Sequence, residues 1–250
     1  MGGPAPGSRG EKIQKVLAAA GICSRREAEG LILQGLVRVN GEVLDNAAAR
    51  VDPEVDLIEC RGRKLEPVSK DAPAGLILYK TAGCVTSSAD PHNQRTVYDL
   101  LPERERGKRW LYVGRLDKNT EGLMLFTDSG ELVHRLSHPS YKVAKHYRVE
   151  VAGTLETQAL KKLTTGFELD GRYMKIDRAR ILKIMADTTV LELVLHQGEK
   201  RQIKRMLGHI GFRVVSLCRT RLGPLTLAGL ERGTCRKLTR DEMNKLIRAV

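Results

Sequence analysis

Apolar residues recur with a helical period in the first part of the chain. Between residues 11 and 20, every third or fourth side chain is apolar, and Gly21 is a natural stop for the helix that this spacing predicts. Ser24 and Glu27 have the spacing of a capping box, which predicts a second helix that begins there and ends near Gly35. The chain is therefore expected to form two short helices before its first strand.

Short strands separated by turns follow these helices. Residues 37–39 predict one strand, Asn40-Gly41 is a strong hairpin turn, and residues 42–44 predict the returning strand. Residues 56–59 fit a further strand. Two helices and a small sheet would together bury one small core.

The small module is set off from the rest of the chain by polar segments. The module spans residues 11–60, and residues 1–10 lack the apolar stretch of a signal peptide, so a flexible tail is expected there. Residues 61–74 are polar and contain two prolines, which is typical of a linker. Residues 75–250 are then expected to form one larger domain.

Apolar runs and helical periods predict the main elements of this larger domain. Strands are predicted over residues 76–79, 109–113, 123–127 and 147–151, and helices over residues 131–136 and 202–210.

The net charge of +13 is unevenly distributed. Residues 1–70 contain 11 basic and 10 acidic side chains, whereas residues 71–250 contain 32 basic and 20 acidic ones. The last stretch, residues 196–250, has 13 basic and 4 acidic residues. Such a concentrated excess favours a polyanionic partner, although a basic soluble surface would have the same composition.

Composition also argues against several classes of protein. No apolar run is long enough to cross a bilayer, so no membrane partner is expected. The five cysteines form no Cys-x-x-Cys pair, which gives no support to a zinc or redox site and fits reduced thiols in a cytoplasm. With 4% aromatic residues, an extended base-stacking platform for single strands is not expected.

The candidate chemistry lies in ten residues between two of the apolar strands. Gly114 and Gly122 stand near the two ends of this segment and allow another backbone to approach closely. Between them are the carboxylate of Asp117 and the basic side chains of Arg115 and Lys118. Loops on a rigid scaffold often carry functional groups, but a single aspartate in a loop is usually a turn-former or a cap. The spacing alone leaves both interpretations open.

The N-terminal module has the motifs GICSRR over residues 21–26 and VRVNG over residues 37–41. It resembles the small RNA-binding domain shared by a small-subunit ribosomal protein, tyrosyl-tRNA synthetases and many RNA-modifying enzymes. Arg25 and Arg26 stand at the start of the second predicted helix, where free backbone N–H groups favour phosphate. Without the motifs, these charges would be read as an ordinary solvated surface. The residues expected to bind RNA here are Lys12, Lys15, Arg25, Arg26 and Arg38.

The segment Gly-Arg-Leu-Asp-Lys-Asn-Thr-Glu-Gly-Leu resembles the signature of the pseudouridine synthases that modify ribosomal RNA. Further matching stretches are residues 78–80, 90–91, 100–102, 127–132, 137–139, 145–149 and 198–207. The resemblance covers nearly the whole chain, from Lys12 to about Glu242, and its C-terminal part is most similar to the large-subunit synthase B group. One departure is Thr81, because the family commonly has proline after the lysine at this position.

The resemblance implies roles for individual residues. Asp117 takes the place of the essential aspartate, and Tyr147 takes the place of the tyrosine that stacks on the target uracil. Lys204, with Arg205 as second choice, takes the place of the basic residue that pairs with the aspartate, since a nearby cation keeps a buried carboxylate charged. No metal ligands are implied. The other residues expected to contact RNA are Lys80, Arg115, Lys118, Lys145, Arg201 and Gln202.

The implied fold is α+β, with a mixed, mainly antiparallel sheet in the catalytic domain, a cleft across its middle, and a small N-terminal α/β RNA-binding domain. The implied reaction isomerises a uridine of ribosomal RNA. The similarity to the large-subunit synthase B group implies that this uridine lies in 23S RNA. No cofactor is expected, because the reaction involves no redox change and no group transfer. The expected partner is ribosomal RNA or a ribosome-assembly intermediate, and a cytoplasmic monomer is expected.

Two alternatives stay open at this point. One is a synthase that acts on 16S RNA. The other is a noncatalytic ribosome-assembly factor that kept the fold and the basic surfaces, against which the presence of Asp117, Tyr147 and Lys204 argues.

Overall fold

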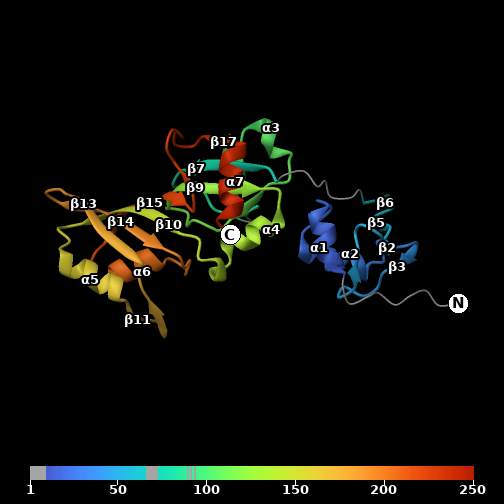
Figure 1. Cartoon of the computed structure of the whole chain (residues 1–250), viewed down its shortest axis with the longest axis horizontal. Coiled ribbons are helices and arrows are strands. Elements are labelled where there is room, and N and C mark those ends of the chain that lie inside the picture. Colours follow the sequence, from blue (N-terminus) through green and yellow to red (C-terminus); the bar gives the residue numbers. More distant parts are fainter. Residues whose placement is uncertain (1–9, 66–72, 89, 91, 93) are drawn as a thin grey trace. The chain divides into compact units, whose positions relative to one another are not determined.

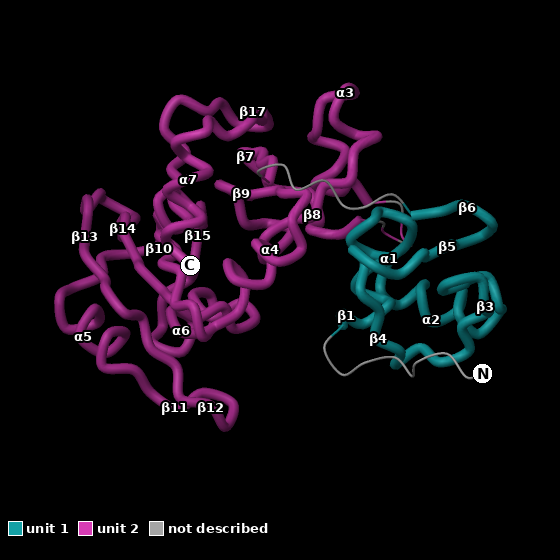
Figure 2. The backbone as a smooth tube through the Cα atoms, turned by 45° about the vertical axis from the view of Figure 1, so that its right-hand side comes forward, with its two compact units in different colours: residues 1–72 teal, residues 73–250 magenta. Residues whose placement is uncertain are grey.

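The chain forms two compact units, residues 1–72 and residues 73–250 (Figures 1 and 2). The computed structural model describes residues 10–65, 73–88, 90, 92 and 94–250. Most of the predicted tail and half of the predicted linker lie outside these ranges, as does Pro91 of the Asp90-Pro91 stretch. Within the described ranges, no helix combines the length and the apolar character needed to cross a membrane.

The smaller unit consists of two helices and short strands. Its elements are β1 (Glu11–Lys12), α1 (Ile13–Ala19), α2 (Arg25–Leu33), β2 (Val37–Val39), β3 (Glu42–Val43), β4 (Arg50–Val51), β5 (Ile58–Cys60) and β6 (Arg63–Lys64). Four strands form a sheet in the order β3-β2-β5-β6, and β1 pairs with β4. Ile13, Leu17 and Ile32 of the helices are buried together with Val37 of β2, so the helical period in the sequence does mark the core.

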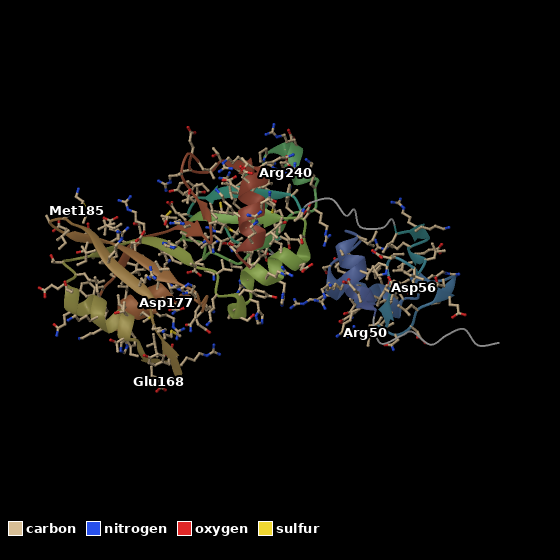
Figure 3. All side chains as sticks on the ribbon, viewed as in Figure 1. Arg50, Asp56, Glu168, Asp177, Met185 and Arg240 are labelled. Carbon is tan, nitrogen blue, oxygen red and sulfur yellow. The ribbon has the colours of Figure 1, made fainter. Side chains whose placement is uncertain are left out.

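Local polar contacts fix the ends of these elements. The capping box forms as predicted, because the Glu27 N–H donates to Ser24 Oγ at 3.2 Å and the Ser24 N–H donates to the Glu27 carboxylate at 2.7 Å. Asp56, labelled in Figure 3, accepts from the Asn40 side chain at 2.9 Å and from the Asp52 N–H at 2.8 Å. These bonds hold the turn that leads into β5.

Several boundaries in the smaller unit differ from the prediction, and the strand predicted over residues 56–59 begins only at Ile58. The first helix begins at Ile13 and not at residue 11, because Glu11 and Lys12 are extended and pair with β4. Arg63 and Lys64 pair with β5, so the sheet continues into the segment that the sequence assigns to a linker.

The larger unit contains one large sheet with helices packed on it (Figure 1). Its elements are β7 (Gly75–Lys80), η1 (Tyr98–Leu100), α3 (Glu103–Arg106), β8 (Leu111–Val113), β9 (Glu121–Thr127), α4 (Gly130–Ser137), η2 (Pro139–Tyr141), β10 (Lys145–Ala152), α5 (Thr157–Thr165), β11 (Phe167–Leu169), β12 (Arg172–Met174), β13 (Arg178–Ile184), β14 (Thr188–Leu195), α6 (Gln202–His209), β15 (Val214–Leu222), β16 (Leu225–Thr226), β17 (Cys235–Lys237) and α7 (Arg240–Arg248).

Among the described strands of this sheet, all neighbours are antiparallel except one pair. The strand order is β13-β14-β10-β15-β9-β7-β17, with β16 beside β15 and β8 beside β9. Strands β15 and β9 are parallel and share only the register pairs Cys218 with Glu121 and Arg219 with Gly122. The predicted mixed, mainly antiparallel sheet is therefore confirmed, and its two halves meet at a short parallel junction.

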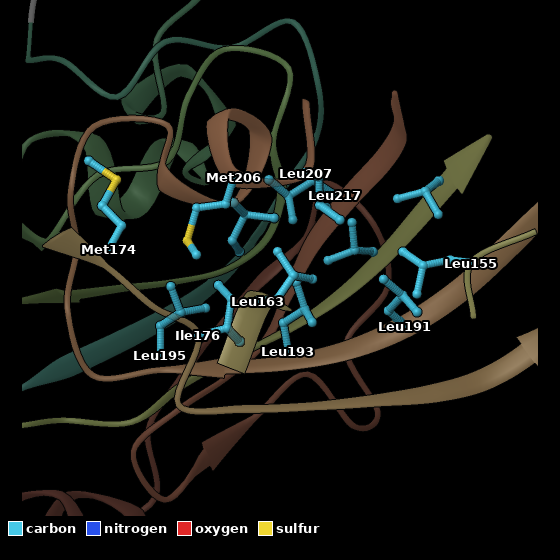
Figure 4. Close-up of a cluster of buried hydrophobic side chains, with 13 residues drawn as sticks. Leu155, Leu163, Met174, Ile176, Leu191, Leu193, Leu195, Met206, Leu207 and Leu217 are labelled. Atoms are coloured by element: carbon cyan, nitrogen blue, oxygen red, sulfur yellow. The ribbon is translucent and has the colours of Figure 1, made fainter. Parts of the chain in front are cut away.

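Separate hydrophobic clusters pack on the two halves of the sheet. Leu193 and Met206 belong to the cluster formed by β10, β14, β15, α5 and α6 (Figure 4). Leu116 and Phe126 belong to a second cluster, on the half that contains β7 and β9. Tyr147 of β10 packs against both clusters. The ring of Tyr147 therefore lies where the two halves of the sheet meet.

The close approach of β9 and β15 predicts that Gly122 tolerates no side chain. A Cβ at this position would lie 2.3 Å from the Arg219 carbonyl oxygen and 2.5 Å from its nitrogen, and Gly122 has φ +112°. We expect Gly122→Ala to lower the free energy of unfolding by about 3 kcal/mol or more, from the combined steric and backbone strain. Urea denaturation followed by circular dichroism measures this loss.

Gly171 provides the matched control for this substitution. It also has a positive φ, +71°, but no atom lies within 4 Å of its Cβ position. Gly171→Ala should therefore cost only the backbone term, about 1–2 kcal/mol. Equal losses for the two variants would contradict the packing argument.

Candidate active site

The loop between β8 and β9 presents Asp117. Arg115 and Lys118 are exposed, Leu116 and Thr120 are buried, and Asp117 is partly buried. The loop is thus anchored by an apolar and a hydroxyl residue on either side of the aspartate. A carboxylate and two cations remain accessible between these anchors.

The ammonium group of Lys80, at the end of β7, holds this loop through its main chain. Lys80 Nζ donates to the carbonyl oxygens of Asp117 at 3.2 Å, Lys118 at 3.1 Å and Thr120 at 2.8 Å, and to that of Thr81 at 3.1 Å. The residue is 0% exposed. The expectation that Lys80 contacts RNA is therefore wrong, because its donors are directed at buried carbonyl groups.

The electrostatic surroundings of Lys80 connect two of the predicted site residues. Burial lowers the pKa of Lys80 to about 8; Cys84, Glu121 and Asp117, in decreasing order, oppose this shift, and the positive charge of Lys204 adds to it. Asp117 and Lys204 therefore both lie within electrostatic reach of the same ammonium group.

Two further residues fix the main chain of the loop. Thr86 Oγ1 donates a hydrogen bond to the Leu116 carbonyl at 2.8 Å and accepts one from the Leu116 N–H at 3.2 Å. The Gly83 N–H donates to the Lys118 carbonyl at 2.9 Å. Together with Lys80, these contacts fix the backbone on both sides of Asp117 without using its carboxylate.

Arg219 of β15 lies against both ends of the loop and was not singled out by the sequence. It is 1% exposed, and its Nε donates to the Leu123 carbonyl at 2.8 Å. One terminal nitrogen lies 4.0 Å from the Cβ position of Gly114, and its backbone excludes a side chain at Gly122. The other terminal nitrogen, Nη2, is buried without a hydrogen-bond partner among the described residues. Leu217 and Arg219 are both buried in β15, two residues apart, as the alternation of side chains along a strand allows.

Tyr147 reaches the same region from the other half of the sheet. It stands opposite Leu193 of β14 and Arg219 of β15, and a register shift separates it from His146 in the pairing with β15. The ring is partly buried and contacts the cluster that includes Leu116, the neighbour of Asp117. An aromatic ring and the candidate carboxylate are therefore brought to one region from strands on different halves of the sheet.

Lys204 and Arg205 are neighbours on α6 but have different partners. Arg205 forms an ion pair with Asp170 and a hydrogen bond of 3.4 Å to the Lys200 carbonyl. Lys204 is partly buried, and its positive charge lowers the pKa of Lys80. Because Arg205 is already paired with Asp170, Lys204 is the better candidate of the two for a cation beside Asp117.

The start of α6 places two predicted RNA contacts differently. Arg201 is exposed and has a left-handed backbone conformation with φ +53°. Gln202 is 3% exposed, and its Nε2 donates to the Lys175 carbonyl at 2.9 Å. The expectation that Gln202 contacts RNA is therefore wrong, whereas Arg201 is available at the surface.

Lys145 is occupied within the protein. Its ammonium group donates to the carbonyl oxygens of Val143 at 3.2 Å and His196 at 3.1 Å. Burial lowers its pKa to about 8, and the charge of Arg219 adds to this shift. These contacts argue against the prediction that Lys145 contacts RNA, and they assign it to the support of β10.

The basic residues proposed for the smaller unit are all exposed: Lys12, Lys15, Arg25, Arg26 and Arg38. Arg25 and Arg26 form the first turn of α2, as the capping box predicts. Lys15 is paired with Glu11 at 2.7 Å, and Lys12 lies in β1. Arg25 and Arg26, together with Lys15 in α1 and Arg38 in β2, therefore lie in the elements predicted for them, whereas Lys12 does not.

Comparison with known proteins identifies both units. Residues 75–209 match the family described as RNA pseudouridylate synthase, and residues 11–57 match the S4 domain. An "uncharacterized RNA pseudouridine synthase" of Aquifex aeolicus (strain VF5) is 39% identical over 96% of this chain and 94% of the relative. The "ribosomal large subunit pseudouridine synthase B" of Bacillus subtilis (strain 168) is 36% identical over 94% of this chain and 95% of the relative. A crystal structure of a pseudouridylate synthase superposes with a TM-score of 0.65 at 30% identity, over 94% of this chain and 99% of the other.

The contacts of Lys80 predict a measurable role in stability. In Lys80→Met, the carbonyl groups that accept from the ammonium lose their donor, so we expect the free energy of unfolding at pH 7 to fall by about 3 kcal/mol. The exposed Lys183 of β13 serves as control, and Lys183→Met should change stability by less than about 0.5 kcal/mol.

The pH dependence gives this difference a sign. The pKa of Lys80 is about 8 in the folded protein and returns towards 10.5 on unfolding. Between these values the unfolded chain binds more protons, so the stability of the wild type should rise with pH relative to Lys80→Met. Urea denaturation at pH 7 and pH 10 measures the difference in free energy of unfolding between the wild type and Lys80→Met. A difference that is smaller at pH 10 than at pH 7 would be inconsistent with a buried Lys80.

Proposed function

Because the chain belongs to the RNA pseudouridylate synthase family, we propose that it converts one uridine of large-subunit ribosomal RNA into pseudouridine, with Asp117 as the catalytic carboxylate. The observation that carries the assignment of Asp117 is its position in a loop whose main chain is fixed by Lys80 and Thr86. The carboxylate itself is left partly exposed. A reacting group needs such a fixed backbone and a free side chain.

The chemistry accounts for one carboxylate and no redox partner. The bond from ribose C1′ to the ring nitrogen N1 breaks, the uracil turns, and a bond from C1′ to ring carbon C5 forms, after which the proton on C5 is lost and one is gained at N1. Asp117 acts either as a nucleophile at C1′ or as a base towards the ribose. Both routes need an ionised carboxylate, and both return it unchanged.

Lys204 is proposed as the cation that keeps Asp117 charged when RNA excludes water. The charges of Lys204 and Asp117 both shift the pKa of Lys80, whereas Arg205 is paired with Asp170. A nearby cation offsets the loss of hydration that a carboxylate suffers in a closed site. Removal of such a partner leaves an uncompensated charge, which is costly.

Tyr147 is proposed to stack on the target uracil after the base leaves its helix. A base within a duplex is inaccessible, so the enzyme must flip it out or take it from a loop, and an aromatic ring then replaces the lost stacking. The position of Tyr147 at the junction of the two hydrophobic clusters supports this role, since packing on both sides restrains the ring.

The smaller unit is proposed to dock the RNA through phosphate contacts. Its match to the S4 domain and the arginine pair at the start of α2 support this division, because helix N-termini and arginines both favour phosphate. Arg115 and Lys118 are proposed to extend the basic surface beside the reacting base. The residues proposed for the reaction all come from one unit of one chain, which supports a monomeric enzyme. We propose that this enzyme works in the cytoplasm, where its ribosomal RNA substrate is found.

The central prediction concerns Asp117. Asp117→Asn should abolish pseudouridine formation on a ribosomal RNA transcript, whereas the Kd for that transcript should stay within about tenfold of the wild type, because phosphate contacts supply most of the affinity. Asp187→Asn, in an exposed turn, is the matched control and should retain full turnover.

Mapping in cells identifies the target. Carbodiimide-dependent reverse-transcription stops are compared between a wild-type strain and an Asp117→Asn strain. Loss of one stop in 23S RNA is expected. Loss of a stop in 16S RNA would move the assignment to the small subunit, and an unchanged pattern would remove the catalytic proposal.

The docking role of the smaller unit predicts a salt-dependent loss of binding. Arg25→Glu with Arg26→Glu should weaken RNA binding at least tenfold and lower the slope of log Kd against log salt by about two. Arg63→Glu with Lys64→Glu makes the same charge change on β6 and is the control. Equal effects of the two pairs would show that net charge, and not the α2 terminus, sets the affinity.

A further inference from the structure

A basic hollow of about 450 Å³ lies beside α6 in the larger unit. It lies along α6 and the turn that leads from it into β15. The residues that line it are Arg201, Lys204, Gly208, Gly211, Phe212, Arg213 and Val214.

The charge of this hollow is of one sign. Arg201, Lys204 and Arg213 supply three cations, and no carboxylate is among the described residues that line it. Arg205, the next cation along the helix, is already neutralised by Asp170. Arg201 and Arg213 are exposed. Such a charged surface is complementary to a polyanion.

One glycine in the hollow is required by the fold. Gly211 has φ +89°, and it ends α6 in a Schellman motif: its N–H donates to the Gly208 carbonyl at 3.0 Å, and the Phe212 N–H donates to the Leu207 carbonyl at 2.9 Å. A left-handed residue after a helix is most often glycine. The fold alone therefore accounts for Gly211.

The other glycine has no such reason. Gly208 lies inside α6, its φ is not positive, and no atom lies within 4 Å of its Cβ position. Glycine inside a helix is less stable than alanine, so this residue costs stability without any gain in packing. What a glycine does provide is a bare backbone that a ligand can approach closely.

We propose that this hollow binds the sugar-phosphate backbone of the substrate RNA, with the cations of Arg201 and Arg213 against phosphates and Gly208 leaving room for the strand. Lys204, the proposed partner of Asp117, also lines the hollow, so a strand bound there would reach the residue proposed to support the reaction. The proposal rests on the proposed function, and it adds a phosphate-binding surface in the larger unit that is separate from the S4 domain.

Gly208→Ala tests the proposal because stability and binding should change in opposite directions. In the full-length protein, we expect the Tm to rise by about 2–4 °C. The Kd for a ribosomal RNA transcript, measured by filter binding, should rise about three- to tenfold, because a methyl group narrows the hollow. Unchanged binding with a raised Tm overturns the proposal, and so does a lowered Tm, which would give Gly208 a structural role.

Two control substitutions separate the hollow from general effects. Gly30→Ala places the same methyl group in α2, where its Cβ meets only the Gln34 side chain at 3.9 Å, and should leave the Kd within twofold. Arg213→Glu should raise the Kd at least tenfold and lower its salt slope, whereas Lys183→Glu on β13 should change both much less. Equal effects of Arg213→Glu and Lys183→Glu also overturn the proposal.

The wild-type protein separates this test from that of the proposed function. If the wild type neither binds nor modifies the transcript, the proposed function fails. If it does both and the hollow variants behave like their controls, only the hollow is refuted.

Discussion

The buried ammonium group of Lys80 is the contact on which the candidate site depends. It gathers the carbonyl oxygens of residues 117, 118 and 120 around one charge, at distances of 2.8–3.2 Å. Carbonyl dipoles that converge on a cation repay part of the cost of burying it, and they fix the backbone that presents Asp117. The charges of Asp117 and Lys204 shift the pKa of this ammonium group in opposite directions.

The short parallel junction between β9 and β15 brings the remaining groups to this loop. It pairs Gly122 with Arg219, and it joins a half-sheet that carries the loop to a half-sheet that carries Tyr147. Only a glycine fits against the Arg219 backbone. Arg219 then extends its guanidinium towards Gly114 and the Leu123 carbonyl. The junction thus connects the two halves of the sheet at the same residues that support the candidate loop.

Much of the fold could be predicted from local patterns. The capping box at Ser24, the strands around the Asp117 loop and the helix at residues 202–209 follow from spacing that involves neighbouring residues only. Element ends were less predictable where a distant partner decides them, as at Glu11–Lys12, which pair with β4. The mixed sheet and the RNA-modifying family followed from motifs that extend over most of the chain.

The burial of polar residues was the part that the sequence could not supply. Lys80 and Gln202 were placed at the RNA surface because both are polar and lie in matching motifs, yet their partners lie 37–40 and 27 positions away in the chain. No local spacing shows that a lysine will find carbonyl groups at such a separation. The same holds for Arg219, whose burial in β15 shows only in the folded sheet.

The loop that carries Asp117 is held by hydrogen bonds to its main chain, so its backbone position does not depend on its exposed side chains. Lys80, Thr86 and Gly83 bond to main-chain atoms, and the side chains of Arg115, Lys118 and Asn119 are exposed. Under the proposed function, substitutions at these three exposed positions would alter the RNA that is accepted without moving the carboxylate. A scaffold of this kind lets relatives diverge in their targets while the reaction geometry is inherited intact.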